Sequence, residues 1–272
     1  MMRVALLAPI HNSLYARLIA AKLLQMEGIS LNGIVVRSHW NWRRFKSEFT
    51  RDGVRLLGKI RQKYILGDER FGNGQDENLL SLAQNINLQI RSLKEIAKQN
   101  KIPYLKVADL NQERSAAFLQ ENAPDLIVFT GGGLIRQNLL SIPKIGILNC
   151  HTGILPPYRG MDVVEWTAAE GKIKEIGFGA TLHLMDQGVD TGSIILKRNL
   201  EIRSDDDLKS IRERLEVLMV ALMIEGIHGL CDGSLHPVPQ DLDAGRQYYV
   251  MHPRLKAFAE RTLSSYKKNR AE

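Results

Sequence analysis

Three adjacent polar residues, Asn149, Cys150 and His151, lie within the stretch LNCHTGILPPYRG (148–160). A thiol beside a histidine suggests a cysteine nucleophile, whereas an amide and a histidine suggest a pair of hydrogen-bond donors. The run GILNCH (146–151) is typical of a strand, in which successive side chains point to opposite faces. Asn149 and His151 are therefore expected to project together, and Cys150 is expected to point to the other side.

The end of a strand is a favourable place for such a pair. Open α/β sheets bind their ligands at the carboxyl ends of the strands, so Asn149 and His151 would face the crevice. Cys150 is expected to be a small buried hydrophobe, because nothing in the sequence supplies the surroundings that lower a thiol pKa. The alternative for Asn149 and His151 is that they only satisfy backbone groups of the next loop.

The elements that position these residues follow an alternating pattern. Apolar runs that predict strands alternate with segments of helical periodicity, which is typical of a parallel, doubly wound sheet. The predicted strands are RVALLAP (3–9), LNGIVVR (31–37), PYLKV (103–107), DLIVFT (125–130) and GILNCH (146–151). The predicted helices are 13–28, opening on Ser13 and closing on Gly28, then 43–64, 79–84, 92–100 and 111–123, with Asn111 as the N-cap of the last.

The second half of the chain has a different pattern. FGATLHLM (178–185) and SIILKRNLEI (193–202) are separated only by a tight loop, so they are expected to pair antiparallel. A long helix is predicted over 204–227, with Ser204 and Asp207 as its N-terminal cap. We expect an α/β, Rossmann-like, doubly wound and mostly parallel sheet, with helices on both faces and an antiparallel strand near the C-terminal side.

The expected division places a catalytic domain at 1–202 and a C-terminal helical extension packed on it at 203–272. The domain would carry a basic helical insertion at about 37–100. From Arg37 to Arg70 there are ten Lys and Arg against four Asp and Glu, a net +6 of the chain's +7. This excess favours an anionic partner such as a phosphorylated small molecule, a nucleic acid or a membrane surface, although a solvated basic helix fits equally well.

Composition limits the class of protein. The 272 residues are 44% apolar and 25% charged, as in an ordinary globular protein, and no apolar run approaches the roughly 18 residues that a membrane span needs. The N-terminal residues predict a first strand rather than a signal peptide. Cys150 and Cys231 are too few for a disulfide framework or a cysteine-based zinc site, and a reducing cytoplasm is the expected compartment. No feature indicates a particular oligomeric state.

Beyond the opening stretch, a series of motifs continues in a fixed order. The series consists of Asn149-x-His151, Leu155-Pro156, Arg159-Gly160, Gly177, Thr181-x-His183 and Asp190-Thr191-Gly192. Over roughly residues 125–200 this order resembles the 10-formyltetrahydrofolate-dependent formyltransferases. That family includes enzymes that formylate glycinamide ribonucleotide, initiator methionyl-tRNA and amino-sugar nucleotides. The resemblance is looser in the preceding Rossmann-like half.

The resemblance implies a catalytic trio of Asn149, His151 and Asp190. In the implied reaction a formyl group moves directly from a folate nitrogen to an amine through a tetrahedral intermediate. An amide donor from Asn149 and an N–H from His151 would stabilise the negative charge on the carbonyl oxygen. Asp190 would accept the amine's proton, directly or through water, and orient His151. Because transfer is direct, Cys150 has no role as a nucleophile.

The resemblance also implies a pocket for the formyl donor. Its pterin would lie against the loop after residue 130 and against the loop before Asp190. The implied contacts are Gly133, Leu134, Ile135, Met185, Asp186, Gly188 and Val189. The glycines of TGGGLI would let the backbone approach closely, and they lack the Lys-Ser/Thr of a phosphate-binding loop.

Three further residues are expected to support the site. His183 and Thr181 match the family's Thr-x-His positions and would stand behind the trio, although packing alone is another explanation for His183. Arg159 would either cap carbonyls or face the acceptor. No spacing of the seven histidines indicates metal ligands, so no metal is predicted.

The acceptor is chosen by elimination. LAPIHNSLY, after the first strand, differs from the glycine-rich phosphate loop of glycinamide ribonucleotide enzymes and from the Gly-Thr-Pro-type loop of methionyl-tRNA formyltransferases. A small phosphorylated amine, such as an amino-sugar nucleotide, is the leading expectation. The alternatives are a methionyl-tRNA formyltransferase-like RNA enzyme, a 10-formyltetrahydrofolate hydrolase, and a folate-binding module without catalysis.

Overall fold

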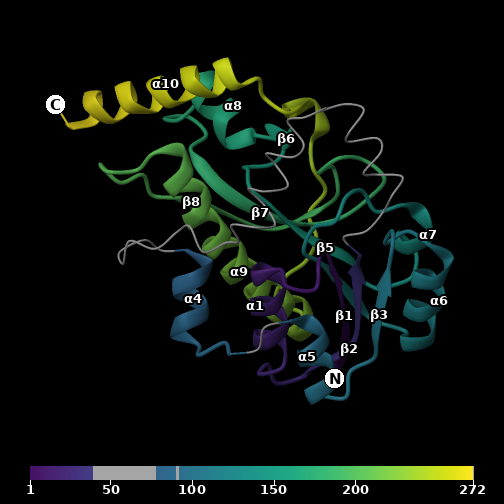
Figure 1. Cartoon of the computed structure of the whole chain (residues 1–272). Coiled ribbons are helices and arrows are strands. Elements are labelled where there is room, and N and C mark those ends of the chain that lie inside the picture. Colours follow the sequence, from purple (N-terminus) through teal and green to yellow (C-terminus); the bar gives the residue numbers. More distant parts are fainter. Residues whose placement is uncertain (39–77, 90–91, 272) are drawn as a thin grey trace, which may run out of the picture.

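The computed structural model describes residues 1–38, 78–89 and 92–271 (Figure 1). These residues form a seven-stranded sheet in the order β3-β2-β1-β4-β5-β7-β8. The strands are β1 (Met2–Ala8), β2 (Ile29–Arg37), β3 (Tyr104–Val107), β4 (Leu126–Phe129), β5 (Gly146–His151), β7 (Phe178–Leu184) and β8 (Ile194–Leu200). The expected helix 43–64 and most of the expected basic insertion lie outside the described residues.

Strand direction follows the expected pattern. The first five strands of the chain pair in parallel, β7 pairs antiparallel with β5, and β8 pairs antiparallel with β7. Only β7 therefore runs against the others in this sheet. The expected mostly parallel, Rossmann-like sheet with one antiparallel strand on the C-terminal side is confirmed.

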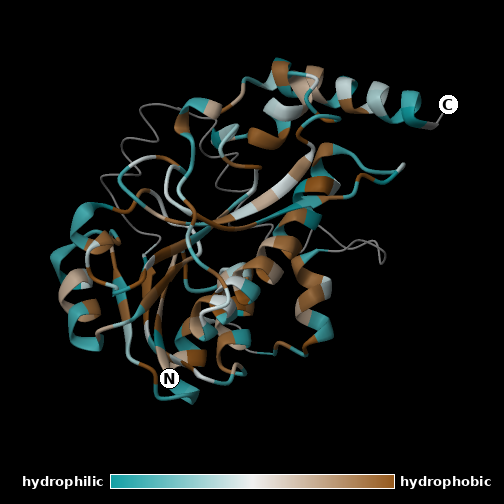
Figure 2. Cartoon of the chain, turned by 180° about the vertical axis from the view of Figure 1, so that it is seen from behind, coloured by the Kyte–Doolittle hydropathy of each residue, from teal (hydrophilic) through white to brown (hydrophobic). Residues whose placement is uncertain are grey.

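Helices cover both faces of the sheet (Figure 1). Their bounds are α1 (Leu14–Leu23), α4 (Leu79–Asn85), α5 (Leu93–Gln99), α6 (Glu113–Asn122), α7 (Gln137–Leu140), α8 (Val163–Ala169), α9 (Leu208–Asp232) and α10 (Pro253–Ala271). One core cluster joins Val4 and Leu6 of β1 to α1, α4, α5 and α9, and a second joins Ala5 and Leu7 of β1 to α6 and α7. Figure 2 shows the hydrophobic residues gathered along the strands between these two helix layers.

The strand order of the sheet reverses at β1, close to β5. From β1 the chain continues outward through β2 and β3, and β4 and β5 then add on the opposite side of β1. In open α/β sheets, ligands bind where the strand order reverses, outside the carboxyl ends of the strands. Asn149 and His151 lie at the carboxyl end of β5, one strand beyond the reversal.

A second, two-stranded sheet lies outside the main one. It pairs β6 (Tyr158–Gly160) in parallel with β9 (Arg246–Tyr248), close to α8 and α10. A short 3₁₀ turn, η3 (Leu242–Ala244), precedes β9. Apolar residues of α9 belong to the main core, and Ala259 and Leu263 of α10 pack in a cluster with α8. The division at residue 202 stays a prediction.

Several helix ends differ from the expected ones. Ser13 caps α1 as predicted, but α1 ends at Leu23 and Gly28 lies in the following turn. The capping box of α9 uses Asp207 and Ser210, so the expected Ser204 cap is wrong. Asn111 does not cap α6, because its side chain instead contacts the backbone of Leu134 and Arg136.

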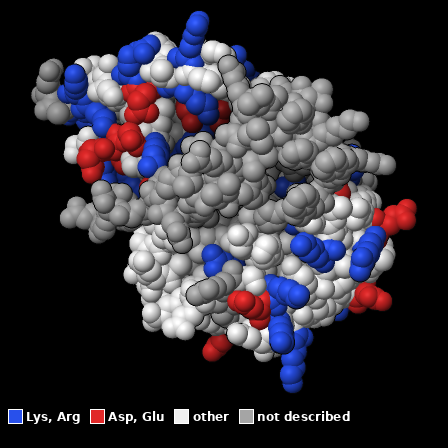
Figure 3. Space-filling model, in the orientation of Figure 1, with Lys and Arg blue, Asp and Glu red and all other residues white. Residues whose placement is uncertain are grey.

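Charge and cysteine state complete the description. Figure 3 shows Lys and Arg interspersed with Asp and Glu over the region of α8 and α10. Cys150 is buried, Cys231 is exposed, and both are free thiols. Within the described residues, no helix combines the length and apolar character that crossing a bilayer requires.

A buried ion pair at the start of α9 gives a stability prediction. Arg214 Nη1 lies 2.6 Å from Asp206 Oδ2, and the two side chains are 7% and 3% exposed. Arg214→Met leaves the Asp206 carboxylate buried without this cation, so the free energy of unfolding should fall by about 3–5 kcal/mol. The matched control is Arg198→Met, because the Arg198–Glu225 pair is exposed and its loss should cost under about 1 kcal/mol. Urea denaturation measures both, and equal losses would contradict the interpretation.

Candidate active site

The end of β5 presents its side chains as alternation predicts. Leu148 and Cys150 lie in the core cluster with α1 and α9, whereas Asn149 and His151 project from the opposite face. Burial raises the pKa of the Cys150 thiol far above its ordinary value. The Cys150 thiol is therefore protonated and inert, as expected for a buried structural cysteine.

The neighbouring strand β7 places a histidine directly beside Asn149. The antiparallel register sets Asn149 opposite His183 and His151 opposite Thr181. His183 Nδ1 lies 2.9 Å from the Leu184 carbonyl, which can only accept, so Nδ1 carries the proton. In the neutral ring Nε2 is then an acceptor, and it lies 3.1 Å from Asn149 Nδ2. This contact orients the Asn149 amide and leaves its second N–H free to point elsewhere.

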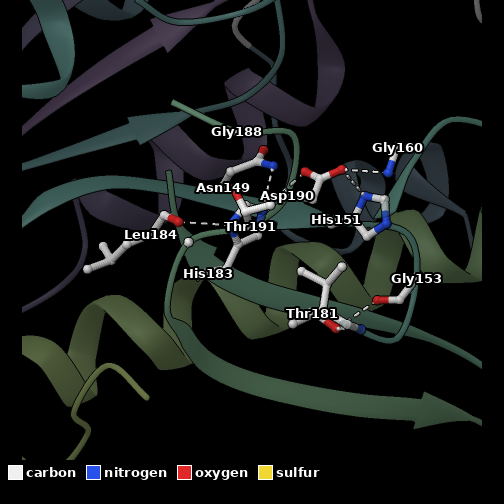
Figure 4. Close-up of polar contacts among 12 residues, drawn as sticks. Asn149, His151, Gly153, Gly160, Thr181, His183, Leu184, Gly188, Asp190 and Thr191 are labelled. Atoms are coloured by element: carbon white, nitrogen blue, oxygen red, sulfur yellow. Dashed lines mark hydrogen bonds and ion pairs between the residues drawn. The ribbon is translucent and has the colours of Figure 1, made fainter. Parts of the chain in front are cut away.

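Asp190 completes a cluster of four polar side chains (Figure 4). It lies in the loop between β7 and β8, in a left-handed conformation with φ 54°. Its Oδ2 is 3.3 Å from His151 Nδ1 and accepts a hydrogen bond from the Gly160 amide at 2.9 Å. Its Oδ1 is 3.4 Å from His183 Nε2. The structure thus brings the predicted Asn149, His151 and Asp190 together.

Burial and polar contacts have opposite effects on the pKa of His151, and also on the pKa of Asp190. Burial lowers the pKa of His151, and the charge of Asp190 and the Tyr158 carbonyl offset only part of this effect. Burial would raise the pKa of Asp190, but the contacts with His183, His151 and the Gly160 amide outweigh burial and lower it to about 2. At neutral pH the site therefore holds a carboxylate beside an uncharged imidazole.

The loop after β5 is fixed by Thr181 and by His151 itself. Thr181 Oγ1 donates to the Gly153 carbonyl at 2.7 Å and accepts from the Leu155 amide at 3.1 Å. His151 Nε2 donates to the Tyr158 carbonyl at 2.9 Å. Because this carbonyl occupies Nε2, Nδ1 is the nitrogen of His151 that can exchange a proton at the site.

The predicted glycine loop after β4 is open to solvent at its tip. Gly131, Gly132 and Gly133 have φ of 107°, 131° and 106°, a region that favours glycine. Leu134 is 71% exposed, whereas Ile135 is buried in the core with α6 and α7. Arg37 of β2 donates to the Gly132 carbonyl, which ties this loop to a strand on the far side of β1.

Asn111 supports the same loop from the other side. Its amide Nδ2 donates to the Leu134 carbonyl at 2.9 Å, and its Oδ1 accepts from the Arg136 amide at 2.7 Å. The residue predicted to cap a helix thus serves the loop of Gly133, Leu134 and Ile135. The loop is held by Arg37 of β2 and by Asn111 in the turn before α6, so its backbone is preorganised.

The second predicted pocket segment runs from Met185 to Val189. Asp186 Oδ1 accepts hydrogen bonds from the Gly188 amide at 3.0 Å and from Thr191 Oγ1 at 2.5 Å. Gln187 Nε2 donates to Gln137 Oε1 at 2.8 Å, which links this loop to α7 beside the glycine loop. The structure therefore places both predicted pocket segments at the same edge of the sheet.

Arg159 makes contacts of the carbonyl-capping kind. Its Nη2 lies 3.0 Å from the Gly245 carbonyl and 3.4 Å from the Leu242 carbonyl. Sequence reasoning missed three further participants: the Tyr158 carbonyl, the Gly160 amide and Gln240, which contacts the Asp190 carbonyl. No local pattern marks Gln240, because it follows Asp190 by 50 residues. The described residues hold no cluster of three or more potential metal ligands.

Comparison with known proteins gives a match to one protein family. Residues 79–227 match the model of a family described as formyl transferase. The methionyl-tRNA formyltransferase of Pelobacter propionicus is 34% identical over 150 residues, which are 55% of this chain and 46% of that protein. The corresponding protein of Anaeromyxobacter dehalogenans is 36% identical over 146 residues, 53% of this chain and 46% of that protein. The chain spans about half the length of the curated relatives it matches.

Solved structures share the fold. The phosphoribosylglycinamide formyltransferase of Anaplasma phagocytophilum is 17% identical with a TM-score of 0.55, covering 85% of this chain and 88% of that one. A sugar N-formyltransferase from Shewanella sp. is 15% identical with a TM-score of 0.55, covering 97% of this chain and 88% of that one. At these identities the likeness concerns the architecture.

The lowered pKa of Asp190 predicts how stability depends on pH. Unfolding returns this carboxyl to its ordinary pKa of 3.8, so ionised Asp190 stabilises the folded state above that value by about 2 kcal/mol. This stabilisation should disappear as pH falls from about 4 towards 2. Urea titrations at several pH values should show the acid loss in the wild type and a shallower loss in Asp190→Asn. Parallel curves for the two proteins would contradict this assignment.

Proposed function

The chain belongs to the formyl transferase family, and from that membership we propose that it transfers a formyl group from 10-formyltetrahydrofolate to a primary amine. The observation that carries the proposal is the convergence of Asn149, His151 and Asp190 at the carboxyl end of β5. An amide donor, an uncharged imidazole and a carboxylate are the groups that acyl transfer between nitrogens requires.

Asn149 is the proposed donor to the formyl oxygen. His183 fixes one amide proton of Asn149, so the other can point at an oxygen that gains negative charge during attack by the amine. A preoriented donor stabilises that charge without reorganising at the moment of reaction. In this role His183 acts through Asn149, and its Nδ1–H bond to the Leu184 carbonyl keeps Nε2 available as the acceptor.

His151 and Asp190 are the proposed acceptors of the proton that the amine loses. With Nε2–H donated to the Tyr158 carbonyl, the unprotonated Nδ1 of neutral His151 faces the Asp190 carboxylate. Uptake of one proton at Nδ1 gives an imidazolium paired with the Asp190 carboxylate. The same proton can later return to the folate nitrogen as it leaves, so no cysteine or other nucleophile of the chain is needed.

The residues around the trio fit the formyl donor. The glycine loop offers backbone N–H and carbonyl groups without side chains at residues 131–133, and Leu134 adds an exposed apolar surface. The Met185–Val189 loop lies across from it, linked through Gln187 and Gln137. We propose that Gly133, Leu134, Ile135, Met185, Asp186, Gly188 and Val189 hold the pterin of 10-formyltetrahydrofolate, so that the formyl group on its N10 nitrogen lies at the trio.

The proposed acceptor is a small phosphorylated amine, such as an amino-sugar nucleotide. A second candidate is the amino group of methionyl-tRNA, which the names of the curated relatives at 34–36% identity favour. The two candidates predict different dependences of acceptor binding on salt concentration. A tRNA brings many phosphates into contact with the protein, whereas a nucleotide brings few.

Variants of the trio test the chemistry. Asn149→Ala should lower kcat by about 100- to 1000-fold through loss of the oxyanion donor. His151→Ala and Asp190→Asn should lower it by about 100- to 10,000-fold through loss of proton transfer. Cys150→Ala is the matched control on the same strand and should keep most of the activity. A well-folded Cys150→Ala protein without activity would overturn direct transfer.

Incubation of 10-formyltetrahydrofolate with a panel of amines identifies the acceptor. The panel should hold amino-sugar nucleotides, glycinamide ribonucleotide and methionyl-tRNA, with formylated product scored by mass spectrometry. Formylation of a small amine is the expected result. Release of formate to water alone would assign a hydrolase, and donor binding without turnover would assign a binding module.

The salt dependence of kcat/KM separates the two acceptor classes. For a small phosphorylated amine, kcat/KM should change little between about 50 and 200 mM salt. For methionyl-tRNA, binding should weaken with a slope of roughly one per phosphate contact on a double logarithmic plot. A steep slope with efficient formylation of methionyl-tRNA would replace the first candidate with the second.

A further inference from the structure

The segment 238–251, which we name the strap, crosses the active-site loops between α9 and α10. In Figure 1 it belongs to the yellow-green connection that joins these two helices. The strap begins where Val238 and Ile194 exchange two backbone hydrogen bonds of 2.8 Å. It ends where the Met251 amide donates to Asp162 Oδ2 at 2.9 Å. It lies outside residues 79–227, the part matched by the family model.

Gln240 of the strap contacts the backbone on both sides of Thr191. Its Nε2 donates to the Asp190 carbonyl at 3.1 Å and to the Gly192 carbonyl at 2.5 Å. Two carbonyls require two N–H groups, and a side-chain amide nitrogen supplies both from one atom. The Asp190 backbone has φ 54°, a conformation that a non-glycine residue adopts only where its surroundings hold it. Gln240 is therefore one of the groups that hold it.

The strap also controls the carboxylate of Asp190 through β6. At Gly160 an added Cβ would lie 2.2 Å from the Tyr248 carbonyl of β9, so the two strands meet as closely as a glycine allows. Arg159 Nη2 reinforces this pairing by donating to the Gly245 carbonyl at 3.0 Å. The Gly160 amide, placed in this way, donates to Asp190 Oδ2 at 2.9 Å.

We propose that the strap aligns Asp190 with His151 and that Gln240 is its principal positioning residue. The inference rests on the proposed function, because alignment matters to catalysis only if Asp190 and His151 exchange a proton. Gln240 touches neither substrate nor reacting atoms in this role. It fixes the main chain of Asp190, Gly160 fixes the carboxylate, and together they keep Oδ2 at 3.3 Å from His151 Nδ1.

Two substitutions remove the N–H donors of Gln240 in different ways. Gln240→Leu keeps the approximate volume and removes the polar group, and Gln240→Glu keeps the shape but sets a carboxylate against two carbonyl oxygens. Each should lower kcat by about 100-fold, the effect of a displacement of roughly 1 Å in a catalytic group. KM for both substrates should stay within about threefold, because the Met185–Val189 loop keeps its own contacts through Asp186. Gln120→Leu, at an exposed glutamine of α6, is the matched control.

A titration of His151 separates positioning from a structural role. In the wild type the charge of Asp190 raises the pKa of His151 against the effect of burial. If Gln240→Leu lets Asp190 move away, this pKa should fall, and the His151 imidazole resonances, assigned with His151→Ala, report it directly. The acidic limb of the pH profile of kcat/KM should shift in the same direction. Gln120→Leu should show neither change.

Several results would overturn the inference. One is kcat within threefold of wild type in both Gln240 variants. Another is a loss of activity that follows a lowered unfolding midpoint while the His151 titration stays unchanged, which is the signature of a structural role. If the wild type formylates no amine, the proposed function fails, but the His151 titration of the Gln240 variants still decides whether the strap positions Asp190.

Discussion

The antiparallel pairing of β7 with β5 is the constraint on which the rest of the site depends. It sets Asn149 opposite His183 and His151 opposite Thr181, so two hydrogen-bonding side chains from each strand share one edge. Register in a sheet moves in steps of one residue, and a slip of β7 by one would turn Thr181 and His183 to the opposite face. Gly226 of α9 lets Leu182 of β7 pack closely against the helix, since an added Cβ would lie 2.0 Å from that leucine. The core thus fixes the register that the site requires.

Burial and charge are balanced differently on His151 and Asp190, the two members of the proposed proton-transferring pair. His151 loses its charge because burial outweighs the effects of Asp190 and the Tyr158 carbonyl, while Asp190 keeps its charge because its contacts with His183, His151 and the Gly160 amide outweigh burial. Titratable groups whose surroundings push their pKa values apart are a physical signature of acid–base sites. Cys150 lies one residue from His151, on the other face of β5. Burial raises the pKa of its thiol and so suppresses its ionisation.

Alternation along β5 was sufficient to predict which way Asn149, Cys150 and His151 point, and alternating apolar runs were sufficient for the sheet. Contacts between distant segments were not predictable in this way. Asn111 stands where a helix cap is expected, yet its amide serves the loop of Leu134, 23 residues later. Gln240 shows no local signal at all, because only the tertiary fold brings it to the carbonyls of Asp190 and Gly192. Side chains that satisfy remote backbone groups leave no periodicity in the sequence.

The strap also has a consequence for the order of events during synthesis. A nascent chain that has emerged through β8 already contains Asn149, His151, His183 and Asp190, but it lacks α9, which contributes apolar residues to the main core. Its Asp190 loop still lacks the Gln240 amide and the β9 edge against Gly160, since both follow the 25 residues of α9. Because domains generally fold as units, the sheet and the site are expected to form together, after the strap has been made. The proposed site is in this sense a property of the fold as far as β9 and not of the segment that carries Asn149, His151 and Asp190 alone.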